Sequence, residues 1–289
     1  MTAAAAPIAA AVPAVPALAP ESSAAVQKIA AIFERRTGQL LGAQRLWRVE
    51  SALTPMLRDL GMTTLAQLAT TLSSAGDVVL VQRVVDALLN HETSFFRDAA
   101  ALNTLADAAL AMHKAAPERR LRIWSAGCST GQEPLSLAIL FEERGIPAHA
   151  LDMIATDVSA DAIARAREAS YSQFEIQRGL PMGRMIAWFE CDDRTWTAHR
   201  ELVHRIQFRT HNLVFDPPPA GIFDIILCRN VMLYFAQDVR RQLLSTLADA
   251  LRPTGLLVLG AGETVIGQTD RFDPSPEWRG TYCRTGNGS

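Results

Sequence analysis

The segment that most constrains the fold is Leu121-Arg-Ile-Trp-Ser-Ala-Gly-Cys-Ser-Thr-Gly-Gln-Glu-Pro134. Apolar residues lead into a turn of small residues, and a run with apolar residues at helical spacing follows. This pattern predicts a strand, a glycine turn and a helix. A glycine turn at a helix N-terminus lets backbone N–H groups approach a ligand closely. The segment therefore predicts a nucleotide-like ligand.

The segments after this turn repeat the order of strand and then helix. Strands are predicted at 152–157 and at Phe223-Asp-Ile-Ile-Leu-Cys228, and Ser159 is predicted to cap a helix. The other expected elements are strands around Phe208 and at 255–259, and helices at 133–144, 159–167 and 237–252. Such alternation predicts an α/β fold with a Rossmann-like, doubly wound and mostly parallel sheet.

Residues 171–207 interrupt the alternation, and we expect them to form a small inserted β-subdomain. Its two short strands are predicted at 185–189 and 201–206, with a loop at 190–196.

The N-terminal part of the chain has a different pattern. Residues 22–90 show apolar residues at helical spacing, which predicts a helical domain. We expect a linker at 91–117 and the α/β domain at 118–289. Residues 1–21 are rich in Ala and Pro and lack the basic start of a secretory signal, so they are predicted to be a disordered tail.

Composition argues against several classes of protein. The net charge of −2 does not favour nucleic-acid binding, and no apolar run is long enough to predict membrane insertion. The four cysteines form no C-x-x-C pair and no zinc-spaced cluster with histidines, so no metal site is expected. Cys128 and Cys228 are predicted to be reduced core thiols, which favours a cytoplasmic location.

Acidic and polar side chains follow three of the predicted strands. Asp157 at a strand end can accept hydrogen bonds from two ribose hydroxyls, or it is only a neighbour of a helix cap. Glu133 can meet a cationic amino group, or it only favours the helix dipole. Arg229 and Asn230 follow a buried strand directly, where open α/β sheets bind ligands. The glycine spacing is not that of a dinucleotide-binding dehydrogenase.

Six motifs along the chain are informative when taken together. They are His91-Glu-Thr-Ser-Phe-Phe-Arg97, Trp124-Ser-Ala-Gly-Cys-Ser-Thr-Gly-Gln-Glu-Pro134, Ala155-Thr-Asp157, Cys228-Arg-Asn-Val-Met-Leu-Tyr-Phe235, Leu257-Val-Leu-Gly-Ala-Gly-Glu263 and Gly280-Thr-Tyr-Cys-Arg284. Together they resemble one family, the CheR-type chemotaxis receptor methyltransferases. The resemblance spans about residues 25–284. It implies transfer of a methyl group from S-adenosylmethionine to glutamate side chains of chemoreceptors, with S-adenosylhomocysteine as the second product.

The resemblance also implies roles for individual residues. Arg97 and Tyr234 would be catalytic and face the methyl group and the incoming carboxylate. The expected cofactor-binding residues are His91, Thr93, Arg97, Gly127, Glu133, Asp157, Asn212, Leu213, Arg229 and Asn230. A sulfonium methyl is already activated and a carboxylate is ionised near neutral pH, so alignment rather than a general base is required.

The chain departs from the family at a few positions. His91 stands where the family has Asn, Leu135 where it has Tyr, and Ala52 where it has Arg. The changes at His91 and Ala52 leave open a non-catalytic module that binds S-adenosylmethionine or a partner on the same fold. Methylation of a nucleic-acid base is disfavoured, because Asp216-Pro-Pro-Pro219 lacks the aromatic residue that would stack on a flipped base.

The expected partner is the cytoplasmic domain of methyl-accepting chemoreceptors. Residues 28–58 carry six basic and two acidic side chains, and such an excess suits an acidic helical bundle or is only a solvated surface. They are Lys28, Arg35, Arg36, Arg45, Arg48 and Arg58 against Glu34 and Glu50. A receptor tail peptide could add a strand to 171–207. We expect a monomer.

Overall fold

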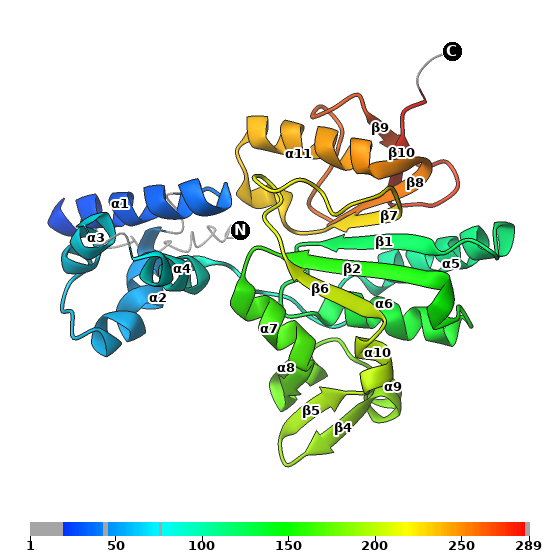
Figure 1. Ribbon diagram of the computed structural model, residues 1–289, viewed down its shortest axis with the longest axis horizontal. Helices are drawn as coiled ribbons and strands as arrows, with labels where there is room; N and C mark the ends of the chain where they lie inside the picture. Colours follow the sequence, from blue (N-terminus) through cyan, green and yellow to red (C-terminus); the bar gives the residue numbers. More distant parts are fainter. Residues whose placement is uncertain (1–19, 43–45, 75–76, 287–289) are drawn as a thin grey trace, which may run out of the picture.

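The computed structural model describes residues 20–42, 46–74 and 77–286 (Figure 1). The disordered tail expected at residues 1–21 lies almost wholly outside this range, and so does the basic side chain of Arg45. In the described part of the chain, none of the helices has both the length and the apolar character needed to cross a bilayer.

A seven-stranded sheet forms the centre of the larger body (Figure 1), in the order β6-β2-β1-β7-β8-β10-β9. Its strands are β1 (Leu121–Ala126), β2 (Leu151–Asp157), β6 (Ile206–Thr210), β7 (Phe223–Cys228), β8 (Leu251–Leu259), β9 (Phe272–Pro274) and β10 (Thr281–Arg284). The first five in this spatial order are parallel, and β10 is antiparallel to both β8 and β9. The predicted α/β fold with a mostly parallel sheet is therefore confirmed.

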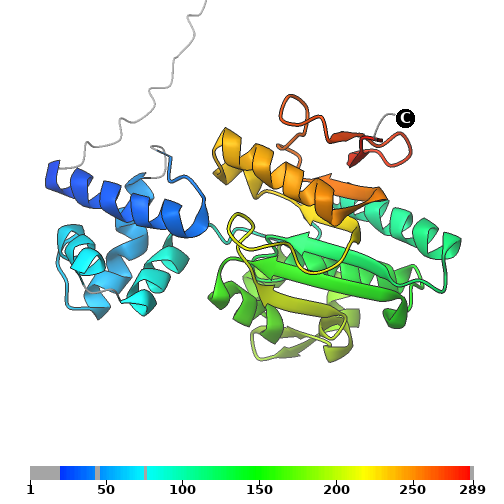
Figure 2. The same ribbon diagram turned by 45° about the horizontal axis from the view of Figure 1, so that its top comes forward.

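Helices cover both faces of this sheet, because successive strand residues point to opposite sides. The helices around the sheet (Figure 2) are α5 (Ala99–Ala115), α6 (Gln132–Glu143), α7 (Ala160–Glu168) and α11 (Gln237–Ala250), with a 3₁₀ turn at Ala148–Ala150. On β1, Ile123 packs into the core beneath α5 and α6, whereas Trp124 packs into the core beneath α11. The predicted cap of α7 is confirmed, since the Ser159 hydroxyl accepts a 3.1 Å hydrogen bond from the Ala162 N–H.

Two stretches differ from the expected boundaries. Most of the expected linker 91–117 is helix α5, and its buried leucines Leu102 and Leu105 belong to the core of the sheet. Helix α11 ends at Ala250, and β8 begins at once with Leu251 rather than at Gly255. Pro253 is tolerated in this strand because the pairing of β7 with β8 is irregular there.

The N-terminal helices form a lobe of their own (Figure 2). They are α1 (Pro20–Thr37), α2 (Leu46–Asp59), α3 (Leu65–Ser74) and α4 (Val78–Leu88). Buried apolar residues from all four, such as Ile29, Leu53, Leu68 and Val84, make a separate core. After α1 the chain turns toward the larger body, where the Leu40 N–H donates to the Tyr234 carbonyl at 2.7 Å.

The inserted segment contains a three-stranded antiparallel sheet, but both strands predicted inside it are wrong. Residues 185–188 belong to a helix, and the strand begins at Phe189; residues 201–203 are helical, and Ile206 starts β6 of the main sheet. The elements are β3 (Ser170–Ser172), α8 (Gln173–Gln177), α9 (Met182–Trp188), β4 (Phe189–Asp192), β5 (Thr195–Ala198) and α10 (Arg200–Val203), with sheet order β3-β5-β4. The expected loop is in fact the β4–β5 hairpin, whose turn residue Asp193 has a φ of +55°.

A single carboxylate fixes the turn that follows β7. Glu263 accepts hydrogen bonds from the backbone N–H groups of Asn230, Val231, Met232 and Gly260, at 2.7 to 2.9 Å. Asn230 adopts a left-handed φ of +59°, which costs energy in a residue with a side chain. The charged acceptor offsets that cost, since hydrogen bonds to a carboxylate are among the strongest in proteins.

We predict that Glu263→Gln destabilises the fold by about 1 to 3 kcal/mol, because the Gln amide group would face backbone N–H donors. Chemical denaturation of the purified chain measures the change. The control is Glu277→Gln, at an exposed position outside this turn, which should leave the free energy of unfolding unchanged. Equal stability of Glu263→Gln and the wild type would contradict the role given to this carboxylate.

Candidate active site

One cavity lies at the carboxyl ends of β1, β2 and β7, where parallel sheets bind ligands. The segment between α4 and α5 and the residues after α1 complete its wall. Every site residue predicted from the sequence lines this cavity, although the role of each remains a prediction. They are His91, Thr93, Arg97, Gly127, Glu133, Asp157, Asn212, Leu213, Arg229, Asn230 and Tyr234.

The glycine turn after β1 is held close to the end of β7. Gly127 has a φ of +87°, and a Cβ at this position would lie 2.4 Å from a methyl carbon of Val231. The N–H groups of Gly127 and Cys128 donate to the Thr156 carbonyl at 2.8 and 2.9 Å. Gly127 is therefore required for packing against Val231, and this packing brings three strand ends to one cavity.

Asp157 is the acidic residue at the end of β2. Its two carboxylate oxygens each accept one backbone hydrogen bond, from Ser129 at 2.8 Å and from Ser159 at 3.0 Å. Burial raises the pKa of the Asp157 carboxyl above its ordinary value. Each oxygen retains a lone pair that can accept a hydroxyl hydrogen from a ligand in the cavity.

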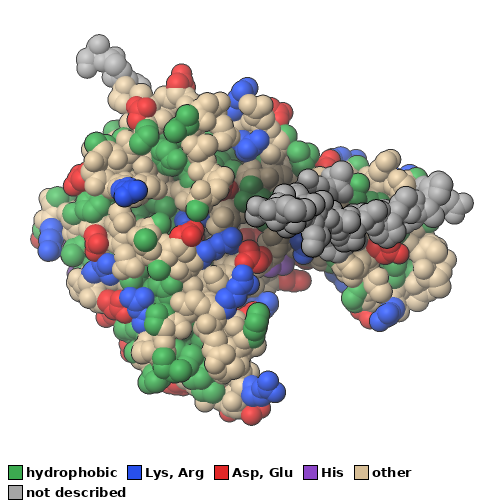
Figure 3. Space-filling model, turned by 180° about the vertical axis from the view of Figure 1, so that it is seen from behind, with side chains coloured by type: hydrophobic (Ala, Val, Ile, Leu, Met, Phe, Trp, Pro, Cys, Tyr) green, Lys and Arg blue, Asp and Glu red, His purple; other side chains and the backbone are tan. Residues whose placement is uncertain are grey.

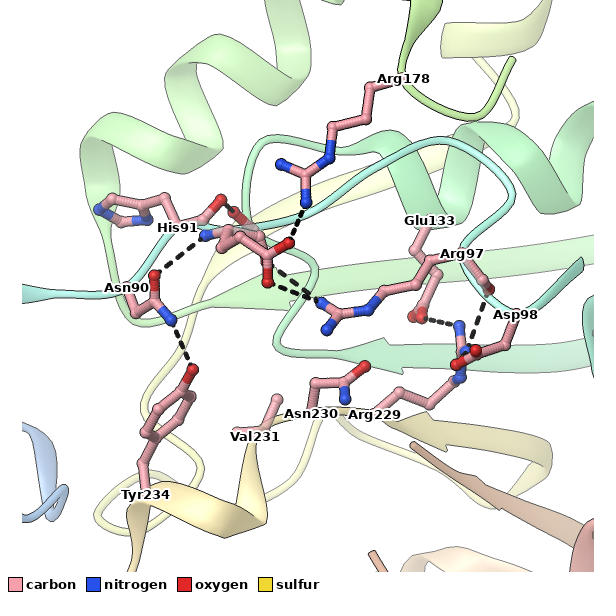
Figure 4. A network of polar contacts seen from close by, with 12 residues as sticks. Asn90, His91, Arg97, Asp98, Glu133, Arg178, Arg229, Asn230, Val231 and Tyr234 are labelled. Carbon is pink, nitrogen blue, oxygen red and sulfur yellow. Dashed lines mark hydrogen bonds and ion pairs between the residues drawn. The ribbon is translucent and has the colours of Figure 1, made fainter. Parts of the chain in front are cut away.

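A buried ion-pair network joins β7 to two helices (Figure 4). Arg229, whose side chain is only 2% exposed, pairs with Glu133 at 2.9 Å and with Asp98 at 2.6 Å. The Ser125 hydroxyl donates to the other Glu133 oxygen at 2.8 Å. The Arg229 Nε is buried and has no hydrogen-bond partner among the described residues. Glu133 and Arg229 both line the cavity, and an acid beside a cation suits the ammonium and the carboxylate of an amino acid.

The segment after α4 supplies the polar groups on the opposite wall. The Asn90 amide donates to the Tyr234 hydroxyl at 2.7 Å, and Arg97 lies 3.3 Å from a carboxylate oxygen of Glu92. The His91 ring points away from Tyr234 and Arg229 (Figure 4), and its Nε2 lies 3.4 Å from the Asp86 carbonyl oxygen. His91 therefore faces the cavity's edge near α4, away from Tyr234 and Arg229.

Asn212 uses its side chain for structure. Its amide nitrogen donates to the Arg36 carbonyl at 2.9 Å, and its amide oxygen accepts from the Val214 N–H at 2.9 Å. These bonds tie the end of α1 to the segment after β6. Asn212 and the neighbouring Leu213 both line the cavity.

Several cavity residues were missed by the sequence analysis. Asn90 and Glu92 flank His91, and Thr37 and Gln39 reach the cavity from the N-terminal lobe. Their participation depends on contacts between distant segments, so spacing along the chain carries no signal for it. Cys128 also lines the cavity, but burial raises the pKa of its thiol, which makes it a poor nucleophile at neutral pH.

Comparisons with known proteins agree with this geometry. Residues 91–280 match the family described as CheR methyltransferase, SAM binding domain. The chain is 31% identical over 247 residues to chemotaxis protein methyltransferase Cher2 of Pseudomonas putida, covering 83% of this chain and 90% of the relative. It is 34% identical over 246 residues to chemotaxis protein methyltransferase 1 of Vibrio cholerae, covering 83% and 89%.

Among solved structures, a TehB-like SAM-dependent methyltransferase from Corynebacterium glutamicum is 17% identical. It matches 80% of this chain and 100% of its own, with a TM-score of only 0.38. The family assignment therefore rests on the sequence matches. This chain belongs to the CheR methyltransferase family, whose matched domain binds S-adenosylmethionine.

Proposed function

We propose that this protein transfers the methyl group of S-adenosylmethionine to glutamate side chains of methyl-accepting chemoreceptors, forming glutamate methyl esters and S-adenosylhomocysteine. One observation carries the proposal: the same cavity holds Asp157 and Glu133 on its inner wall and a partly exposed arginine, Arg97, at its rim. The inner acids suit a nucleoside that carries an amino acid, and the arginine suits a visiting carboxylate.

The residues on the inner wall fit the cofactor. Asp157 would accept hydrogen bonds from the ribose hydroxyls, Glu133 would bind the ammonium group, and the unpartnered Nε of Arg229 would donate to the carboxylate. When bound, the cofactor supplies a sulfonium methyl group that is already electrophilic.

The remaining task of the protein is orientation. A glutamate acceptor is ionised near neutral pH and needs no general base. Arg97 would position its carboxylate, and the Tyr234 hydroxyl, fixed by Asn90 at 2.7 Å, would border the path of the methyl group. An arginine that bound the acceptor too tightly would stabilise the ground state as well, so its partial exposure suits a positioning role.

Charge on the N-terminal lobe supports an acidic partner. Lys28, Arg35 and Arg36 line a groove between α1, the end of α3 and the start of α4. Figure 3 shows basic, acidic and histidine side chains gathered where this lobe meets the larger body. Opposite charge on a receptor helix bundle would speed encounter. In the inserted sheet, β4 is an edge strand, which supports pairing with a receptor tail peptide.

The free thiols of Cys128 and Cys228 are both buried, which supports a reducing, cytoplasmic setting for this reaction. We propose that the protein acts there as a monomer.

We predict that Arg97→Ala lowers methyl transfer by about 100-fold while the fold persists, because the acceptor carboxylate loses its positioning cation. The assay measures base-labile methyl incorporation into receptor cytoplasmic fragments. Arg241→Ala, at an exposed position on α11, is the matched control and should keep the wild-type rate. Binding of S-adenosylhomocysteine by the wild type without any methyl incorporation would contradict the proposed function and favour a non-catalytic binding module.

We predict that affinity for S-adenosylhomocysteine falls as the pH drops through the raised pKa of Asp157. In the ligand-free protein, the Asp157 carboxyl has a raised pKa and binds its proton more tightly than an ordinary aspartate. Ribose hydroxyls donate to the ionised carboxylate, so ligand binding favours ionisation and lowers this pKa. Calorimetry at about pH 5 and about pH 7.5 measures the difference, and proton release on binding should appear in the acidic range.

The matched variants are Asp157→Asn and Asp161→Asn. The first should weaken binding by about 10- to 100-fold at neutral pH and flatten the pH dependence. The second changes an exposed carboxylate in the first turn of α7 and should behave as the wild type. Wild-type affinity in Asp157→Asn would remove this residue from the cofactor site.

A further inference from the structure

The carboxylate of Glu92 lies between two arginines from different parts of the fold. One of its oxygens is 3.3 Å from Nη1 of Arg97, and the other pairs with Nη2 of Arg178. Arg178 directly follows α8 in the inserted subdomain, whereas Glu92 and Arg97 belong to the segment before α5. Figure 4 shows the side chains of Arg178 and Arg97 converging from different directions.

The position of Arg178 is set by a close backbone contact. The next residue, Gly179, has a φ of +96°, and a Cβ there would lie 2.0 Å from the Phe95 carbonyl oxygen. The Phe95 ring packs edge-on against Tyr171 at 5.0 Å and against Phe189 at 5.4 Å, both in the inserted subdomain. The backbone that carries Arg178 is therefore held firmly against the segment that carries Glu92 and Arg97.

Glu92, Arg97 and Arg178 together carry one excess positive charge, which can bind a second carboxylate. Two arginines share one acid, and both hydrogen-bonding contacts of Arg97 with Glu92 use Nη1. A guanidinium has five N–H donors, so Nε and Nη2 of Arg97 remain to bind a visitor. The side chains of Glu92, Arg97 and Arg178 are 42%, 34% and 47% exposed, so a visiting side chain can reach them and the pairs can exchange.

We propose that Glu92 and Arg178 are positioning residues for Arg97, and that they set the affinity for the acceptor carboxylate. Glu92 holds Arg97 at the rim of the cavity when no acceptor is present. Arg178 partly neutralises the Glu92 carboxylate, so that Glu92 releases Arg97 when the acceptor glutamate binds. The inference rests on the proposed function, in which Arg97 receives that glutamate.

This arrangement gives the inserted subdomain a part in the reaction. Removal of Arg178 leaves Glu92 to pair with Arg97 alone, so that Glu92 and the incoming carboxylate share a single guanidinium and repel each other. Binding of the acceptor is then weakened, whereas the inner wall with Asp157 and Glu133 is untouched. The expected signature is a raised KM for the acceptor, with little change in kcat or in cofactor affinity.

The experiment is a double-mutant cycle on the full chain. Arg178→Met should raise the KM for a receptor cytoplasmic fragment by about three- to fivefold, the scale of an exposed ion pair. Glu92→Gln should lower this KM, and Arg178→Met should have no further effect in the Glu92→Gln background. Calorimetry with S-adenosylhomocysteine should give wild-type affinity for all three variants.

A matched control comes from the same subdomain. Arg200 on α10 is exposed and lies outside the cavity, so Arg200→Met should leave the KM unchanged. An unchanged KM in Arg178→Met, or an effect that persists in the Glu92→Gln background, would overturn this inference while wild-type transfer still supported the proposed function. Failure of the wild type to transfer methyl groups would overturn both.

Discussion

The buried guanidinium of Arg229 is the interaction on which the site depends. A charge that is 2% exposed is costly unless it is paired, and here the two partners come from the start of α6 and from the residue before α5. Arg229 also donates to the Arg97 carbonyl at 3.0 Å. The end of β7 therefore fastens the segment before α5 to the sheet, and that segment carries Arg97, Glu92 and Asn90.

Each wall of the cavity is held by a different physical means. The turn after β1 relies on Gly127, because only a glycine leaves room for Val231. The turn after β7 relies on the four backbone hydrogen bonds that the Glu263 carboxylate accepts. A backbone hydrogen bond from Leu40 to Tyr234 joins the N-terminal lobe to the larger body. A preorganised wall suits a reaction whose main requirement is the alignment of two reactants.

The inserted subdomain contacts residues on two sides of the cavity. The Tyr171 hydroxyl donates to the Thr130 carbonyl at 2.8 Å, directly within the glycine turn, and Arg178 reaches Glu92 from the other side. Contacts of this kind connect a surface that is open to partners with both the cofactor wall and the acceptor wall. Under the proposed function, these contacts would let the subdomain contribute to the choice of acceptor.

The sequence alone determined the elements whose periodicity is long and regular, and the residues that stand at strand ends. The alternation after Leu121 predicted the parallel sheet, and Asp157 and Arg229 were found because a polar residue after a buried strand falls at the ligand-binding edge. Family motifs extended this to Arg97 and Tyr234, which the structure places on the same cavity.

Only the tertiary structure decided the short elements and the shared contacts. The strand at Phe189 is brief, and its pairing with β5 rather than local pattern sets its start, so the helix before it was mistaken for a strand. The roles of Glu263 and Glu92 arise from donors far away in the chain, at residues 230–232 and at Arg178. A sequence pattern reports the period of one segment, but a carboxylate acquires its function from the charges and N–H groups that folding brings around it.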